Sequence, residues 1–177
     1  MAWRCHGICV QPYWVAALKD APLPVISVAG FPFGADPKEH KAGGAARAVD
    51  DGASEIDIVL NLGALRSGDL AAVGADVAAV RRAIPGRVLK VILETGLLNP
   101  AELAVAARIC VEEGADFLKT CTGYGPRGAT VTDVEILRVF APVKASGGIR
   151  TLEQATALVE ACAERLGTSA TATILGR

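Results

Sequence analysis

Aromatic residues make up only 5% of the sequence, and the formal net charge is −1. Nucleic-acid-binding surfaces normally combine a basic patch with aromatic side chains that stack on bases, so this composition argues against a nucleic-acid partner. No stretch reaches the roughly 20 consecutive apolar residues that a membrane-spanning helix needs. The first residues also lack an apolar segment followed by a small-residue cleavage site. We therefore expect no membrane partner and no secretory signal.

Histidine and paired cysteine are scarce as well. The two histidines, His6 and His40, are too few and too far apart to suggest a metal centre or a Ser-His-Asp triad. The five cysteines form no CxxC pair, which argues against a zinc site or a disulfide framework. We therefore expect no bound metal and a location in the reducing cytoplasm.

What the sequence does contain is a repeated alternation of two patterns. Short apolar, β-rich runs alternate with Ala-rich segments that have helical spacing. These runs occupy residues 7–11, 24–30, 55–61, 88–94, 116–122, 142–147 and 165–170. A chain of 177 residues that is 51% hydrophobic suits one domain with a sizeable core. We expect that single domain to span residues 1–177.

Capping signals mark several helix boundaries. Residues 36–39 (DPKE) offer an N-cap at Asp36, a proline at the first helical position and an acid at the third. Residues 99–102 (NPAE) repeat this arrangement, and residues 151–154 (TLEQ) form a capping-box pattern. Gly52 and Gly114 lie where helices are expected to end.

The alternation of strands and helices predicts an α/β fold with a parallel sheet covered by helices. An open dinucleotide-binding sheet would prefer a G-x-G-x-x-G turn after its first strand, and the sequence has none. Polar residues recur inside the predicted strands, which favours a TIM (β/α)8-type barrel with a site at the C-terminal ends of its strands. The sequence offers seven strands, whereas a closed barrel of this type has eight.

Strand alternation assigns a group of charged side chains to one face of the predicted sheet. The group comprises Asp57, Lys90, Glu94, Lys119 and Lys144. Helices must cover the opposite, apolar faces, so the charged group is expected in the barrel interior. Either these charges pair as a buried structural network, or they carry chemistry. For Lys90 and Glu94 the structural interpretation is favoured.

For Lys119 and Lys144 the chemical interpretation is stronger. A lysine beside a second cation in a partly desolvated pocket has a lowered pKa, because both surroundings disfavour the ammonium form. A neutral amine attacks carbonyl groups to form a Schiff base. Asp57, on a nearby strand, could then move protons directly or through one water. The three residues together predict a site for carbonyl chemistry.

Two glycine-containing turns follow the last two predicted strands. Gly147 and Gly148 directly follow the residue pattern that contains Lys144, and Gly167, Thr168 and Ser169 close the final strand. In barrels, the loops after strands seven and eight often hold a phosphate group with backbone N–H groups. Each turn alone is weak support, but the pair favours a sugar-phosphate substrate.

Several blocks of the sequence resemble the signature blocks of the deoxyribose-phosphate aldolase family. They are ICVQPYWV (8–15), GFPFG (30–34), EIDIVLNLGAL (55–65), KVILETGLL (90–98), GADFLKTCTGYG (114–125) and VKASGGIRT (143–151). The blocks occur in the family's order and cover nearly the whole chain.

This resemblance implies a metal-independent class I aldolase that uses no cofactor. Its substrates would be small phosphorylated sugars and aldehydes: 2-deoxy-D-ribose 5-phosphate would be interconverted with D-glyceraldehyde 3-phosphate and acetaldehyde. By resemblance, Lys119 forms the Schiff base, Lys144 lowers its pKa or shuttles protons, and Asp57 takes part in proton transfer. The phosphate-binding turns correspond to Gly147, Gly148, Thr168 and Ser169. The family resemblance also implies a homo-oligomer, either a dimer or a tetramer.

The sequence departs from the family pattern in four places, one of which is Pro126-Arg127 in a loop that is often richer in Gly and Thr. The family normally begins with a strand bearing an Asp-His-Thr block and a helix, so we expect a barrel without its first strand and helix. Cys121 stands where the family has Ser or Thr, and Ser169-Ala170 replaces a pair of serines. An alternative function is therefore a catalytically impaired remnant that only binds sugar phosphate. A further alternative is a Schiff-base aldolase for another phosphorylated aldehyde.

Overall fold

The computed structural model describes residues 5–176 and divides the chain into two compact units, Met1–Lys90 and Val91–Arg177. The described residues form seven strands that follow one another in chain order, β1-β2-β3-β4-β5-β6-β7. Strand β4 (Val88–Ile92) carries the chain from the first unit into the second. All seven strands lie within the runs expected from the sequence. The single domain over residues 1–177 stays a prediction.

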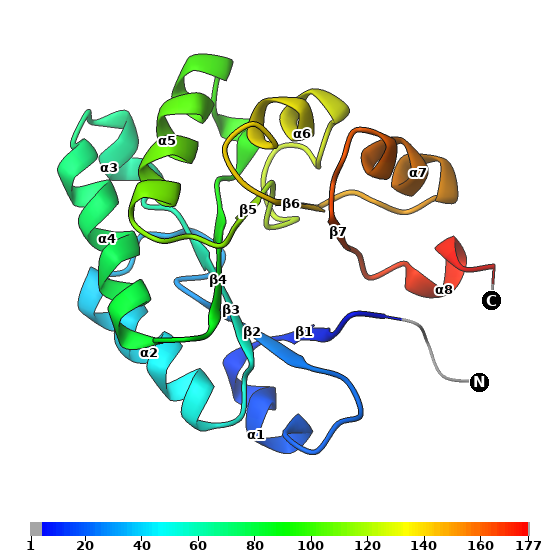
Figure 1. Cartoon of the computed structure of the whole chain (residues 1–177), viewed down its shortest axis with the longest axis horizontal. Coiled ribbons are helices and arrows are strands. Elements are labelled where there is room, and N and C mark those ends of the chain that lie inside the picture. The colour runs from blue at the N-terminus through cyan, green and yellow to red at the C-terminus, as the bar shows by residue number, and fades with distance from the viewer. Residues whose placement is uncertain (1–4, 177) are drawn as a thin grey trace. The chain divides into compact units, whose positions relative to one another are not determined.

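The first unit contains three parallel strands and the helices that follow them. Its elements are β1 (Ile8–Val10), η1 (Pro12–Trp14), α1 (Val15–Leu18), β2 (Val25–Ala29), α2 (Lys38–Asp50), β3 (Glu55–Val59), α3 (Leu62–Arg66) and α4 (Leu70–Ala83). Strand β2 pairs in parallel with β1 and with β3, and Val28 lies opposite Asp57. Helices α2 and α4 pack side by side along this sheet (Figure 1).

The core of the first unit follows the spacing of its apolar residues. Val73, Val77 and Val80 recur at helical spacing on α4 and are all buried. On β3, Ile56 and Ile58 are fully buried on the face opposite Asp57. The β3 strand is thus buried on both faces, as in sheets covered by helices.

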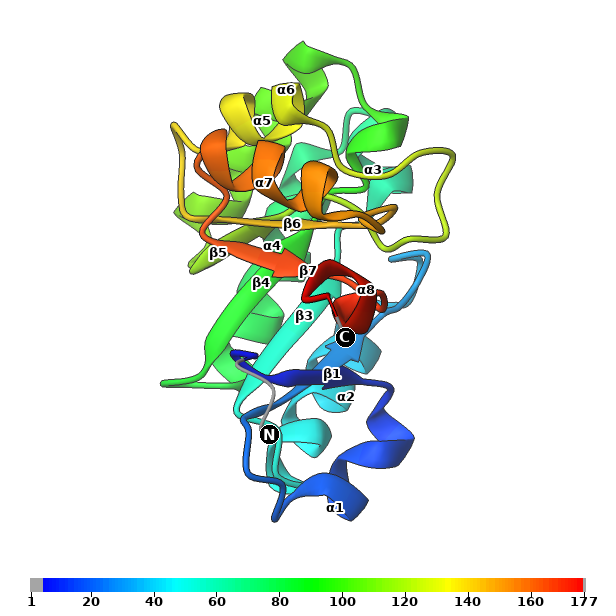
Figure 2. The same cartoon turned by 90° about the vertical axis from the view of Figure 1, so that its right-hand side faces the viewer.

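The second unit begins within β4 and repeats the strand–helix alternation. Its elements are η2 (Thr95–Leu97), α5 (Pro100–Glu112), β5 (Phe117–Lys119), α6 (Val131–Leu137), β6 (Val143–Ser146), α7 (Leu152–Glu160), β7 (Arg165–Gly167) and α8 (Thr171–Ile174). Strand β6 pairs in parallel with β5 and β7. Helices α5, α6 and α7 lie on one side of these strands (Figure 2).

Most of the predicted helix boundaries are confirmed. Asn99 and Thr151 both form capping boxes, and Pro100 opens α5. Gly52 and Gly114 follow the helix ends with φ angles of 117° and 92°. The prediction that Asp36 is an N-cap is wrong. Pro37 occupies the cap position in an extended conformation (ψ 142°), so the helix begins one residue later, with no side-chain cap.

Within residues 5–176, no helix is long and apolar enough to cross a membrane.

Candidate active site

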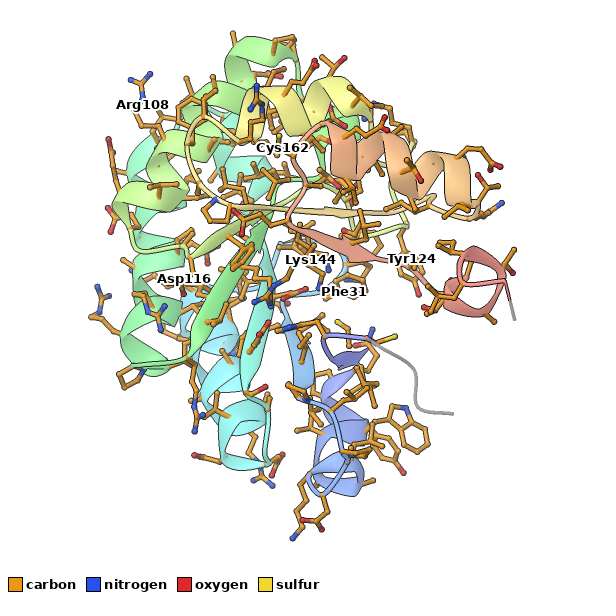
Figure 3. All side chains as sticks on the ribbon, turned by 45° about the vertical axis from the view of Figure 1, so that its right-hand side comes forward. Phe31, Arg108, Asp116, Tyr124, Lys144 and Cys162 are labelled. Carbon is orange, nitrogen blue, oxygen red and sulfur yellow. The ribbon has the colours of Figure 1, made fainter. Side chains whose placement is uncertain are left out.

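Lys119 and Lys144 occupy directly paired positions on the parallel strands β5 and β6. Paired residues on neighbouring strands point to the same face, about 4.8 Å apart at the backbone. The two side chains are 6% and 5% exposed, so both lysines are buried. Lys144 projects from β6 on the side away from α6 and α7 (Figure 3). The sequence assigned both residues to one face, and the register now places them side by side.

Side-chain hydrogen bonds hold β5 and β6 together just beyond the two lysines. The Thr120 hydroxyl donates to the carbonyl of Ser146 (2.9 Å) and accepts from its backbone N–H (2.9 Å). The Ser146 hydroxyl donates to the carbonyl of Cys121 (2.6 Å). All three residues are buried. These bonds fix the spacing of the strands at the level of the candidate site.

Gly167 on β7 makes room for the Lys144 side chain. It pairs with Ser146, on the same face of the sheet as Lys144. A Cβ at this position would lie 3.2 Å from Cε of Lys144 and 2.9 Å from Cβ of Ser146. Because these distances are shorter than ordinary contacts, a side chain at position 167 would displace Lys144.

The two turns expected to hold a phosphate group are joined to each other. The Thr168 hydroxyl donates to the carbonyl of Ile149 (2.7 Å), next to Gly148, and accepts from the N–H of Ala170 (2.9 Å). Gly147 and Gly148 have φ angles of 90° and 73°, which favour glycine. Thr168 thus connects the two turns, and the phosphate-binding role assigned to it from the sequence stays a prediction.

Arg127 lies in the loop after β5 and pairs with Asp133 at 2.6 and 2.9 Å. It also donates to the carbonyl of Thr95 (3.0 Å). Burial alone would raise the pKa of Asp133, but hydrogen bonds from Arg127, Thr95 and Thr130 outweigh it and lower that pKa. The hydrogen bonds and charge of Asp133 raise the pKa of Arg127 in turn. Arg127 therefore anchors its loop.

Cys121 is fully buried, and burial raises the pKa of its thiol. Its sulfur lies 3.2 Å from the hydroxyl of Thr95, which itself donates to Asp133 (2.8 Å). The cysteine that departs from the family pattern is thus an uncharged part of a hydrogen-bond network. Sequence reasoning missed this network because its hydrogen bonds join Thr95 to residues 26 and 38 positions away, and only the Thr130–Asp133 capping box has a local signal.

In the first unit, Asp57 is part of a buried ionic network. The ammonium of Lys90 lies 2.8 Å from Asp57 and 2.5 Å from Glu55, and Glu55 lies 2.8 Å from the ring of His6. Lys90 and Asp57 are both fully buried. The favoured interpretation of Lys90 as a structural ion-pair residue fits this geometry. Its partners, however, are Asp57 and Glu55, whereas the carboxylate of Glu94 accepts hydrogen bonds from Thr122.

Two further features define what the described residues can bind. Among residues 5–176, no group of three or more His, Cys, Asp or Glu side chains is placed to hold a metal ion. The second unit combines paired lysines on β5 and β6 with two connected, glycine-containing turns. Paired amines react with carbonyl compounds, and glycine turns of this conformation let a backbone approach an anion closely.

Comparison with solved structures defines the class of protein. The structure of "QR15, an aldolase" matches with a TM-score of 0.93 and 42% identity, over 97% of this chain and 80% of that one. A deoxyribose phosphate aldolase from Aeropyrum pernix, described as having a unique tetrameric structure, matches with a TM-score of 0.86 and 31% identity, over 98% of this chain and 76% of that one. The protein is therefore an α/β aldolase of the TIM-barrel type, as the sequence predicted.

Sequence comparison defines the family. Residues 16–177 match the sequence pattern of the DeoC/LacD family of aldolases, and the chain belongs to this family. A deoxyribose-phosphate aldolase of Thermus thermophilus is 51% identical, over 93% of this chain and 78% of its own length. One from Brevibacillus brevis is 48% identical, over 96% of this chain and 80% of its own length.

Proposed function

We propose that this chain cleaves 2-deoxy-D-ribose 5-phosphate reversibly to D-glyceraldehyde 3-phosphate and acetaldehyde. The observation that carries the proposal is the pairing of Lys119 with Lys144 on neighbouring strands of a family aldolase. The relatives named deoxyribose-phosphate aldolase support the choice of substrate. The reaction is that of a lyase acting through a lysine Schiff base.

In this mechanism Lys119 is the nucleophile. Its neutral amine adds to the C1 carbonyl of the sugar, and loss of water gives an iminium ion. Removal of the C3 hydroxyl proton then lets the C2–C3 bond break. Its electron pair moves into the iminium to give an enamine, and D-glyceraldehyde 3-phosphate leaves. Protonation of the enamine at C2 and hydrolysis release acetaldehyde and regenerate Lys119. The iminium serves as the electron sink, so these steps need no metal or cofactor.

Lys144 and Asp57 support this chemistry in different ways. A second ammonium beside Lys119 disfavours the charged form of the nucleophile and so keeps it reactive near neutral pH. Lys144 can also pass protons to and from the reacting carbon atoms. Asp57 takes part in the proton transfer at C3, with Lys90 balancing its charge at 2.8 Å.

The phosphate group is assigned to the connected turns of the second unit. Gly147 and Gly148 allow the backbone to approach an anion closely, and their left-handed conformations are typical of anion-binding turns. Ser169 is exposed and adds a hydroxyl group, while Thr168 holds the two turns at a fixed spacing.

The chain acts as one domain over residues 1–177, in a homo-oligomer that is a dimer or a tetramer. The tetrameric relative from Aeropyrum pernix supports an oligomer. All five cysteines are free, which supports a reducing, cytoplasmic location.

Reductive trapping tests the proposal. The protein is incubated with acetaldehyde, reduced with borohydride, and the adduct is located by mass spectrometry. We expect modification at Lys119 and none in Lys119→Leu, with Lys38→Leu, an exposed-lysine variant, as the matched control. A folded protein that forms no adduct would overturn the proposed activity and leave the alternative of a catalytically impaired remnant.

A further inference from the structure

Glu94 has an environment that the proposed chemistry does not explain. It lies between β4 and η2 with φ 49° and ψ 60°, a left-handed conformation that is unfavourable for residues with a side chain. It is also 3% exposed, so a carboxylate is buried at this point. Both features are costly, and such costs persist where the surroundings hold the residue in place.

The carboxylate of Glu94 holds the start of the loop that follows β5. One oxygen accepts hydrogen bonds from the backbone N–H of Thr122 (3.1 Å) and from the Thr122 hydroxyl. The other oxygen is buried and has no hydrogen-bond partner among the described residues. A Cβ at Gly125 would lie 2.5 Å from this second oxygen. The segment from Thr122 to Gly125 therefore closes around the carboxylate, and a side chain at position 125 would require the Glu94 carboxylate to move.

The same loop packs on the glycine turn assigned to the phosphate group. A Cβ at Gly147 would lie 3.4 Å from the backbone nitrogen of Gly123, and one at Gly128 would lie 2.3 Å from the carbonyl oxygen of Gly147. The N–H of Ala129 donates to that carbonyl at 3.0 Å. The loop thus contacts Gly147 at both ends of the loop, through Gly123 and through Gly128 and Ala129.

The two ends of the loop have anchors on adjacent residues. Arg127 binds the carbonyl of Thr95, and it is held by Asp133 as well. Thr122 is bound by the side chain of Glu94, the residue before Thr95. The far end of the loop therefore has a second anchor in Asp133, whereas the Thr122 hydroxyl bonds only the Glu94 carboxylate and the N–H of Tyr124 among the described residues. Loss of the Glu94 carboxylate would release the near end.

We propose that Glu94 is a positioning residue for phosphate binding, which rests on the proposed function of the Gly147–Gly148 turn. Its carboxylate fixes Thr122, and Thr122 sets how the segment beginning at Gly123 lies against Gly147. The effect passes through the backbone of the loop and concerns the phosphate group of the substrate. Schiff-base formation at Lys119, on the preceding strand, does not depend on it.

Two substitutions test this role. Glu94→Gln keeps the shape of the side chain and removes its charge. Glu94→Asn shortens the side chain, while asparagine tolerates the left-handed backbone, so this variant is expected to fold without the strain. For both we expect the KM for 2-deoxyribose 5-phosphate to rise about tenfold, the loss expected from weakening one charge-assisted hydrogen bond. We expect kcat to change less than about twofold if the reacting atoms are undisturbed.

Unphosphorylated 2-deoxyribose separates a phosphate effect from general disruption. Its KM and the borohydride adduct of acetaldehyde at Lys119 should match those of the unsubstituted protein, and Glu112→Gln, at the exposed end of α5, should change nothing. An unchanged KM for the phosphorylated sugar, or equal increases for both sugars, would overturn the inference. If the unsubstituted protein formed no adduct with acetaldehyde, the proposed function itself would fail, and the inference with it.

Discussion

Lys144 lies across Gly167, with its Cε 3.2 Å from the place that a Cβ on that glycine would occupy. The contact joins two neighbouring strands, because Lys144 belongs to β6 and Gly167 to β7. The absence of a side chain at Gly167 therefore allows the Lys144 side chain to lie over β7.

Substitution of Gly167 by alanine should impair turnover with little effect on folding. The added methyl group moves Lys144 away from its position beside Lys119, and misplacement of a catalytic group by about 1 Å can cost on the order of 100-fold in rate. We expect kcat to fall by about 10- to 100-fold. Steady-state kinetics measure this, and thermal unfolding provides the control. A Gly167→Ala protein with unchanged kcat would show that Lys144 does not need its present position.

Removal of the Lys144 charge should shift the pH dependence of the reaction. In Lys144→Leu the nucleophile loses the neighbouring ammonium that disfavours its own protonation. The rising limb of the plot of kcat/KM against pH should then shift to higher pH, by about one pH unit or more. Borohydride trapping as a function of pH reports the same change without the later steps. An unaltered profile would remove Lys144 from this role.

The ion pair of Lys41 and Asp76 predicts a strong effect on stability. Lys41 is 1% exposed, bonds the carbonyl of Val59 at 2.9 Å and pairs with Asp76 between α2 and α4. Lys41→Met leaves a buried carboxylate without its cation, which should lower the free energy of unfolding by about 3–5 kcal/mol. The double substitution Lys41→Met/Asp76→Leu should recover most of this loss.

Urea unfolding measures these differences, and an exposed ion pair gives the control. Arg47 and Asp51 pair at 2.9 Å on the surface of α2, so Arg47→Met should change the free energy of unfolding far less than Lys41→Met does. Equal effects of Lys41→Met and Arg47→Met would contradict the importance of the buried pair.

Asp133 predicts a pH dependence of stability. Its pKa is lowered in the folded protein, so the folded state binds fewer protons than the unfolded state. The stability that this carboxylate contributes is complete above its unfolded pKa, about 3.9, and is lost as the pH falls through the lower, folded pKa. Asp133→Asn should therefore be less stable than the unsubstituted protein at pH 7, by about 1–3 kcal/mol.

The comparison of the two proteins should be made across the acid range. Urea titrations between about pH 2 and pH 7 bracket the unfolded pKa of this carboxylate. The difference in the free energy of unfolding should shrink towards the acid end. A difference that stays constant with pH would mean that the charge of Asp133 contributes nothing.

Local patterns were enough to predict the strands, most helix boundaries and the common face of Lys119 and Lys144. These patterns could not predict the register that pairs Lys119 with Lys144, because a register depends on how two separate strands align. Glu94 shows where strand alternation fails: it was assigned to the face of Lys90, but the chain turns into a left-handed conformation at this residue and redirects the side chain. The contacts of Arg127 join the loop after β5 to Thr95 in η2 and to Asp133 in α6, and no short-range pattern marks the Thr95 contact.

The reciprocal hydrogen bonds of Thr120 and Ser146 have a further consequence for the width of the sheet. At this level the amide of Ser146 is bound by a hydroxyl group of the neighbouring strand in place of a backbone carbonyl. The spacing of β5 and β6, which carry Lys119 and Lys144, is therefore set partly by the length of the Thr120 side chain. A longer or shorter side chain at position 120 would therefore change the distance between the two backbones, and with it the separation of the lysines, without any substitution at the lysines themselves.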